Sequence, residues 1–91
     1  MAGNASEWKI LWSSHALSEL SKIDRPDAER IIEKLDQVAG SENPARFLSR
    51  LVGYDEFKLR VGDYRAIILL LNGEKTIFIE NLGHRERVYR R

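Results

Sequence analysis

The chain has 91 residues, of which 43% are hydrophobic, so it can bury one small core and has no length for a second. It contains no cysteine and two histidines, which excludes disulfides, thiolate metal sites and thiol nucleophiles. No apolar run approaches the roughly 18 residues of a membrane span. We therefore expect a single intracellular, cytoplasmic domain over residues 1–91, without metal or cofactor, in which residues 1–6 form a mobile polar leader.

The net charge of +1 hides an uneven distribution of charge along the chain. Residues 82–91, LGHRERVYRR, hold four arginines and a histidine against one glutamate, whereas much of the acid lies in the first half. A basic segment of this kind favours a phosphate-bearing partner more than the net charge does.

The first predicted element is a short strand over residues 7–12, EWKILW. Apolar and polar residues alternate there with the period of two that is typical of a half-buried strand. The residues that share its apolar face are Trp8, Ile10 and Trp12. Their position indicates a role in the core.

Two helices are predicted to follow this strand. Ser13 or Ser14 can cap the first helix, and the second restarts at Pro26 and ends at Gly40. Its apolar residues recur at helical spacing, at Ala28, Ile31, Ile32, Leu35, Val38 and Ala39. The short link between the helices predicts a helical hairpin, and residues 41–53 follow as a loop.

A β-hairpin is predicted after the loop. Residues 56–61, EFKLRV, alternate charged and apolar side chains, as a half-buried strand does. Gly62-Asp63 then supplies a two-residue turn, because glycine at the first central position takes a positive φ without steric cost.

This turn sets the register of the hairpin and gathers cations on one face. Arg60 is expected opposite Arg65, and Lys58 opposite Ile67. Directly paired residues share a face of the sheet, so Lys58, Arg60 and Arg65 are predicted to lie together.

Asn72-Gly73 is a second turn signal and predicts a third strand. The register that follows is Leu71 opposite Glu74, Ile67 opposite Phe78 and Arg65 opposite Glu80. One face of this meander is almost entirely apolar, and we expect the helical hairpin to cover it. The predicted order is therefore β-α-α-β-β-β, an α+β domain with an N-terminal helical hairpin packed on a twisted antiparallel sheet.

The other face of the meander combines the cations with apolar side chains. Its apolar members are predicted to be Ile67, Leu69, Leu71, Phe78 and Leu82. An exposed apolar patch of this kind marks a protein interface. We therefore expect a protein partner to bind Ile67, Leu69, Leu71 and Phe78.

The cations suit a site that grips a phosphodiester, because arginine presents a fixed fork to phosphate oxygens and tyrosine can stack on a base. The candidates are Lys58, Arg65, Arg85, Arg87 and Tyr89. Such a site could bind RNA or cut it. Neighbouring positive charges lower an amine's proton affinity, so Lys58 is a candidate general base. The alternative interpretation is structural: a cross-strand ion pair between Arg65 and Glu80, and a solvated edge at Lys58.

The motif string FKLRVGDYRAII, followed by the NG hairpin and by LGHRERVY, resembles the RelE/ParE superfamily of bacterial and archaeal toxins from Trp8 to Tyr89. The resemblance implies a small toxin of a type II toxin–antitoxin system, neutralised by an antitoxin that wraps around it in a hetero-oligomer. Its RelE branch implies mRNA cleavage in the ribosomal A site by attack of the 2′-hydroxyl, without metal, which inhibits translation and arrests growth.

The resemblance also assigns site residues. The family's lysine after the aromatic residue of its second strand matches Lys58, and the arginine of its GDYR motif matches Arg65. The family's arginine after the last strand matches Arg85, and its tyrosine that stacks on the substrate base matches Tyr89. Further RNA contacts are expected from Arg60, Arg87 and Arg90. RelE enzymes have a second lysine where this chain has Glu56. Since other branches transfer protons through glutamate and histidine, Glu56 and His84 are alternative acid/base residues.

Two other functions stay open at this level. ParE-like toxins share the fold and inhibit DNA gyrase without nuclease chemistry. Alternatively, the glutamate at position 56 would fit a toxin that has lost its activity and survives as an antitoxin-binding protein. The retained lysine, arginines and tyrosine favour the nuclease.

Overall fold

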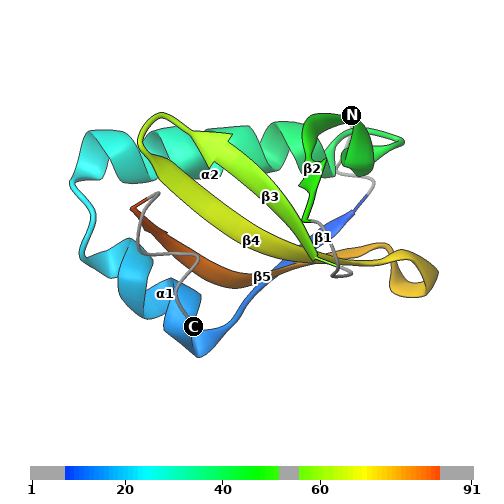
Figure 1. Ribbon diagram of the computed structural model, residues 1–91, viewed down its shortest axis with the longest axis horizontal. Helices are drawn as coiled ribbons and strands as arrows, with labels where there is room; N and C mark the ends of the chain where they lie inside the picture. The colour runs from blue at the N-terminus through cyan, green and yellow to red at the C-terminus, as the bar shows by residue number, and fades with distance from the viewer. Residues whose placement is uncertain (1–7, 52–55, 85–91) are drawn as a thin grey trace.

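The computed structural model describes residues 8–51 and 56–84, and it confirms the predicted order of elements (Figure 1). The helices are α1 (Ser14–Ser21), α2 (Arg25–Ala39) and the 3-10 helices η1 (Pro44–Phe47) and η2 (Asn72–Glu74). The strands are β1 (Lys9–Trp12), β2 (Ser49–Arg50), β3 (Glu56–Val61), β4 (Tyr64–Leu71) and β5 (Thr76–His84). The predicted leader, residues 1–6, lies outside the described residues.

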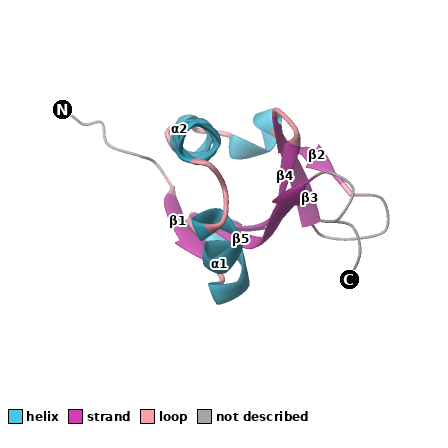
Figure 2. Ribbon diagram, turned by 90° about the vertical axis from the view of Figure 1, so that its left-hand side faces the viewer, coloured by secondary structure: helices cyan, strands magenta, loops and turns pink. Residues whose placement is uncertain are grey.

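The sheet has five strands in the order β1-β5-β4-β3-β2. All neighbouring strands are antiparallel except β1, which runs parallel to β5. Figure 2 shows the sheet curling from β1 on one side to β2 on the other, with α2 seen end-on beside it. The predicted fold class, helices packed on a twisted and mostly antiparallel sheet, is confirmed.

The helices cover one face of this sheet, here called the inner face. Buried side chains of α1 and α2 join those of β3, β4 and β5 in one core cluster. Its members are Trp8, Ala16, Ile31, Leu35, Val38, Ala39, Leu59, Ala66, Ile68, Ile77, Ile79 and Leu82. Ser13 caps α1 through a hydrogen bond that Ala16 N donates to its Oγ at 3.0 Å, and Gly40 ends α2, as the sequence predicted.

The predicted loop over residues 41–53 was wrong in part. Its middle forms the 3-10 helix η1, and Ser49–Arg50 forms the edge strand β2. β2 pairs Ser49 with Lys58 and Arg50 with Phe57, and the guanidinium of Arg50 lies 5.2 Å from the centre of the Phe57 ring. This cation–π contact fixes the short strand to the edge of the sheet.

The first hairpin has the predicted register. Val61 pairs with Tyr64 across the two-residue turn, and Gly62 has the expected positive φ of 61°. The faces of β3 and β4 are therefore those that the sequence predicted.

The second turn is longer than predicted. Residues 72–74 form η2, Lys75 takes a left-handed conformation with φ of 48°, and Leu71 pairs with Thr76 rather than with Glu74. The predicted two-residue turn was wrong because four residues, 72–75, connect the two strands. As a result, Ile67 does not pair with Phe78.

An irregularity in β5 shifts the register a second time. Ile68 pairs with Ile79, but Ile67 pairs with Asn81, so the residue between them, Glu80, bulges out of the ladder. The bulge moves Leu82 to the inner face, where it is buried, and the prediction that Leu82 lies on the other face was wrong.

No helix among residues 8–51 and 56–84 has the length and apolar character needed to cross a membrane.

Candidate functional site

The face of the sheet away from the helices, here called the outer face, carries the predicted cations next to the β3–β4 turn. The register places Arg60 directly opposite Arg65 and Lys58 opposite Ile67, so Lys58, Arg60 and Arg65 share this face. Paired residues on neighbouring strands have Cα atoms about 4.5–5.5 Å apart. The structure therefore brings the three cations together at one end of the sheet, as predicted.

The opposition of Arg60 and Arg65 is an electrostatic cost for the folded chain, because like charges directly opposite one another repel. Arg60 is exposed, and its Nε donates a long hydrogen bond of 3.4 Å to the carbonyl oxygen of Gly62 in the turn. Arg65 is half-buried, with its Nε out of contact with solvent.

Glu56 occupies the outer face two residues before Lys58 and is 8% exposed. Its place in the ladder is opposite Leu69. Residues two apart along a strand project from the same face about 6.6 Å apart, so the carboxylate and the ammonium lie on adjoining positions. Carboxylate and ammonium groups are both side chains that can transfer a proton, so both residues are candidates for that role.

The structure places His84, the other candidate acid/base residue, on the opposite face. His84 pairs with Tyr64, and the two rings meet edge to face with their centres 5.7 Å apart. Tyr64 packs against the core on the inner face. His84 is therefore not brought together with Lys58 and Arg65.

The predicted register that pairs Arg65 with Glu80 was wrong, because the bulge puts Gly83 opposite Arg65 and Asn81 opposite Ile67. Asn81 therefore belongs to the row that contains Lys58, and the sequence prediction missed it. The signal was present: the apolar residues of β5 are spaced by two from Ile77 to Ile79 and then by three to Leu82, which is the spacing of a bulge.

The remaining predicted site residues lie outside the described residues, and their assignments stay predictions. They are Arg85, Arg87, Tyr89 and Arg90. Among residues 8–51 and 56–84 there is no group of three histidine, aspartate or glutamate side chains placed to hold a metal ion.

The apolar part of the outer face is smaller than predicted. Ile67 is only 1% exposed and offers no surface to a partner, whereas Leu71 is 37% exposed and Leu69 and Phe78 are half-buried. The register adds a residue that the sequence prediction missed, because Leu11 of β1 pairs with Phe78 and is 51% exposed. The patch thus extends from β4 across β5 to the edge strand β1.

Over residues 10–89 the sequence matches the family described as the ParE toxin of the parDE type II toxin–antitoxin system. The chain belongs to this family. The match covers most of the toxin chain, including the cationic end of the outer face and the arginine-rich segment after β5. No curated protein sequence matches the toxin.

Solved structures similar to this toxin include complexes of RelE toxins with RelB antitoxins. The archaeal RelE–RelB complex from Pyrococcus horikoshii is similar with a TM-score of 0.75 and 24% identity, over 89% of this chain and 98% of that one. The intact RelBE complex from E. coli is similar with a TM-score of 0.72 and 25% identity, over 88% of this chain and 99% of that one. The RelBE2 complex from Mycobacterium tuberculosis is similar with a TM-score of 0.64 and 21% identity, over 87% of this chain and 99% of that one.

These similarities confirm the predicted superfamily. The toxin has the RelE fold over nearly the whole length of its structural relatives, and it belongs to a type II toxin–antitoxin system.

Proposed function

We propose that this toxin is an endoribonuclease that cleaves mRNA on the ribosome and thereby inhibits translation. The observation that carries the proposal is the gathering of Lys58, Arg60 and Arg65 at one end of the outer face, beside the buried carboxylate of Glu56. Cleavage of RNA by its own 2′-hydroxyl needs cations around the phosphorus and a group that accepts a proton. The outer face offers both within one hairpin.

The roles follow from the positions on the outer face. Arg65 and Lys58 stabilise the charge that develops on the phosphate oxygens, because preorganised cations act most strongly where water is excluded. Glu56 or Lys58 accepts the proton of the 2′-hydroxyl. Since His84 pairs with Tyr64 on the inner face, its placement supports Glu56 and Lys58 over His84 for this role. Arg85 and Tyr89 complete the proposed site as leaving-group and base-stacking residues.

Cleavage of a defined mRNA by the purified toxin tests the proposal, with and without programmed ribosomes and with a chelator present. We expect cuts on ribosomes that resist the chelator. Arg65→Gln should lower the cleavage rate by about 100-fold to 1,000-fold, as removal of one transition-state donor does. Glu56→Gln should abolish most of the activity if its carboxylate is the base.

The matched control is Lys9→Gln, which removes one exposed cation from β1 at the opposite edge of the sheet. It should leave the cleavage rate unchanged. Full activity of Arg65→Gln on ribosomes would rule out the role assigned to this arginine.

A second candidate function is inhibition of DNA gyrase, because the matching family is described by its ParE toxin. A supercoiling assay with purified gyrase separates the two functions. Supercoiling that stops at toxin concentrations without effect on translation would support the gyrase-directed function and contradict the nuclease.

The proposed partner of the free toxin is its antitoxin, as in the RelE–RelB complexes that it resembles. The patch of Leu11, Leu69, Leu71 and Phe78 is the surface that we assign to the antitoxin. Apolar side chains clustered on an exposed sheet face gain free energy when a partner covers them.

A further inference from the structure

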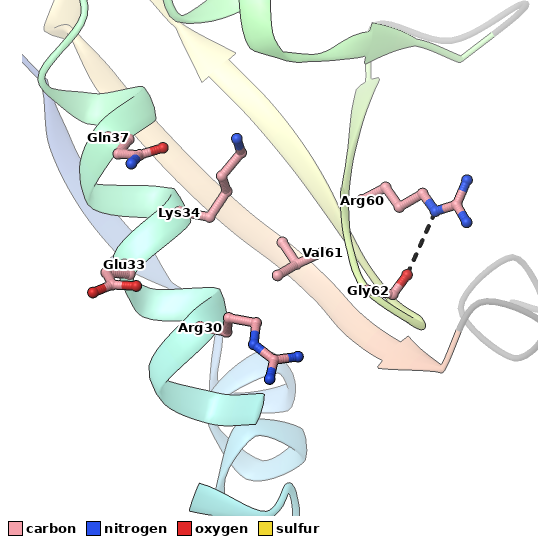
Figure 3. Close-up of a pocket in the computed structure, with 7 residues that line it drawn as sticks. All are labelled: Arg30, Glu33, Lys34, Gln37, Arg60, Val61 and Gly62. Carbon is pink, nitrogen blue, oxygen red and sulfur yellow. Dashed lines mark hydrogen bonds between the residues drawn. The ribbon is translucent and has the colours of Figure 1, made fainter. Parts of the chain in front are cut away.

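A second basic site lies on the other side of the β3–β4 turn from the outer-face cations. It is an open cleft of about 370 Å³ between α2 and the end of β3 (Figure 3). The cleft is lined by Arg30, Glu33, Lys34, Gln37, Arg60, Val61 and Gly62. The four α2 residues recur at the spacing of one helix face, so this face of α2 is polar and turns toward the hairpin.

The charges of this cleft favour an anion. Figure 3 shows the side chains of Arg30 and Lys34 extending from α2 into the cleft, whereas the carboxylate of Glu33 points away from the hairpin. The Nζ of Lys34 also lies 5.9 Å from the centre of the Phe47 ring, a cation–π contact that leaves its N–H donors available to an anion. Arg30 has a surface ion pair with Asp27 at 3.5 Å, in which the side chain of Arg30 is 65% exposed and that of Asp27 is 37% exposed. Such pairs contribute only about 0–1 kcal/mol, so Arg30 can exchange Asp27 for another anion at little cost.

Arg60 connects the cleft to the outer face. It lines the cleft, yet its guanidinium extends away from α2, toward the face on which it opposes Arg65 (Figure 3). Among the described strands, β2 reaches only Phe57 and Lys58 of β3, so the end of β3 is an edge of the sheet. A strand of RNA can therefore pass over this edge from the outer face into the cleft without meeting another β-strand.

The chemistry of the lining distinguishes a phosphate backbone from a protein partner. Among the described residues that line the cleft, Val61 alone has an apolar side chain, whereas a protein interface is centred on buried apolar or aromatic anchors. Two cations and the amide of Gln37 instead match the contacts that proteins make with phosphate and sugar oxygens. The antitoxin already has an apolar surface elsewhere on the toxin.

We infer that this cleft binds the phosphate backbone of the RNA substrate next to the segment held by Lys58 and Arg65. The inference rests on the proposed function, since it adds a site for the same RNA. Arg30 and Lys34 bind phosphates there as positioning residues, and Arg60 bridges the two segments of the strand.

The experiment measures the fluorescence anisotropy of a labelled, unstructured RNA of about 15 nucleotides, a length within the site size of single-strand binders, against the full-length toxin. The double variant Arg30→Gln with Lys34→Gln should bind it about 10-fold more weakly. The salt dependence should also weaken. The slope of the logarithm of the association constant against the logarithm of salt concentration should become less negative by about 1.4, because each phosphate contact on a single strand contributes about 0.7. A shorter RNA that occupies only the outer face should show no difference.

The matched control is the double variant Lys9→Gln with Lys22→Gln, which removes two exposed cations that do not line the cleft. It has the same net charge as the cleft variant and should retain nearly all of the affinity. Equal affinities of the two double variants would overturn the inference. The inference would also be overturned if the cleft variant bound the antitoxin more weakly but bound RNA as before. That result would assign the cleft to an acidic protein segment.

Cleavage on ribosomes separates this inference from the proposed function. The cleft variant should raise KM and leave kcat near its original value, because Arg30 and Lys34 do not contact the scissile phosphate. Inactivity of the unchanged toxin would contradict the proposed function, and the anisotropy would still decide whether the cleft binds RNA.

Discussion

Arg60 and Arg65 show how one turn residue can determine the electrostatics of a site. The two arginines occupy directly opposite positions on neighbouring strands because the turn between them has two residues, and this turn has a positive φ at Gly62. The conformation of a single glycine thus holds two like charges in opposition. Both cations therefore belong to the cationic end of the outer face.

Gly62→Ala should lower the free energy of unfolding by about 1–2 kcal/mol, because an L side chain is strained at a φ of 61°. No atom lies within 4 Å of the position of an added Cβ, so the cost comes from the backbone alone. Denaturant titration measures it.

Gly73→Ala is the matched control, since its added Cβ also meets open space and its φ is not positive. It should change the free energy of unfolding by less than about 0.5 kcal/mol. An equal loss in the two variants would contradict the assignment of strain to Gly62.

At the scale of elements, α1 and the bulge of β5 are joined by one serine. The Oγ of Ser13 accepts a hydrogen bond from Ala16 N at 3.0 Å and donates one to the carbonyl oxygen of Glu80 at 2.8 Å. Ser13 N also donates to the carbonyl oxygen of Ile79. The helix cap therefore supports the place where β5 changes register and Asn81 reaches the outer face.

Ser13→Ala should lower the free energy of unfolding by about 1–2 kcal/mol, because it removes the cap and leaves a half-buried carbonyl without its donor. Thermal unfolding followed by circular dichroism measures the loss. Ser21→Ala, which removes only an exposed bond to the carbonyl oxygen of Ser18, should cost less than about 0.5 kcal/mol. A loss as large at Ser21 would show that α1 needs no specific cap.

The two hairpins show what the sequence could predict and what it could not. The placement of Lys58, Arg60 and Arg65 was predictable, because Gly62-Asp63 permits one short turn and hence one register. The register of the second hairpin was not predictable, because Lys75 takes a left-handed conformation that is uncommon for lysine.

Strand β1 was predicted as an element but not in its pairing. Its alternation of apolar and polar residues indicates a strand and a buried face, and the structure confirms that Trp8 is buried. Nothing in four residues specifies that the neighbour is β5 or that the pair is parallel. The extension of the apolar patch to Leu11 follows from that pairing and was therefore missed.

At the scale of the whole molecule, the outer face divides into a cationic end and an apolar end. RNA and antitoxin are thus assigned to adjoining parts of one face, with Glu56 and Leu69 paired where the two parts meet. If the antitoxin binds the apolar part and extends toward Lys58, the antitoxin and the RNA compete for this boundary. Neutralisation of the toxin then needs no change in its fold.

Leu71→Ser should weaken antitoxin binding about fivefold to 10-fold, because it removes an exposed apolar contact from the patch. Titration calorimetry with the purified antitoxin measures the dissociation constant. Leu17→Ser is the matched control, since Leu17 is 50% exposed on α1, outside the outer face. An unchanged dissociation constant for Leu71→Ser, or an equal loss for Leu17→Ser, would contradict the assignment of the patch.

The parallel pairing of β1 with β5 has a consequence for the time at which the toxin completes its fold. β1 is synthesised before all the other described elements and its partner β5 is the last of them, and Ser13 bonds to Glu80, 67 residues further along the chain. Closing so long a loop is slow compared with the formation of helices and local hairpins. A ribosome that translates this protein therefore synthesises β5 before the described sheet can close, so each newly made toxin completes this sheet only after synthesis has passed β5.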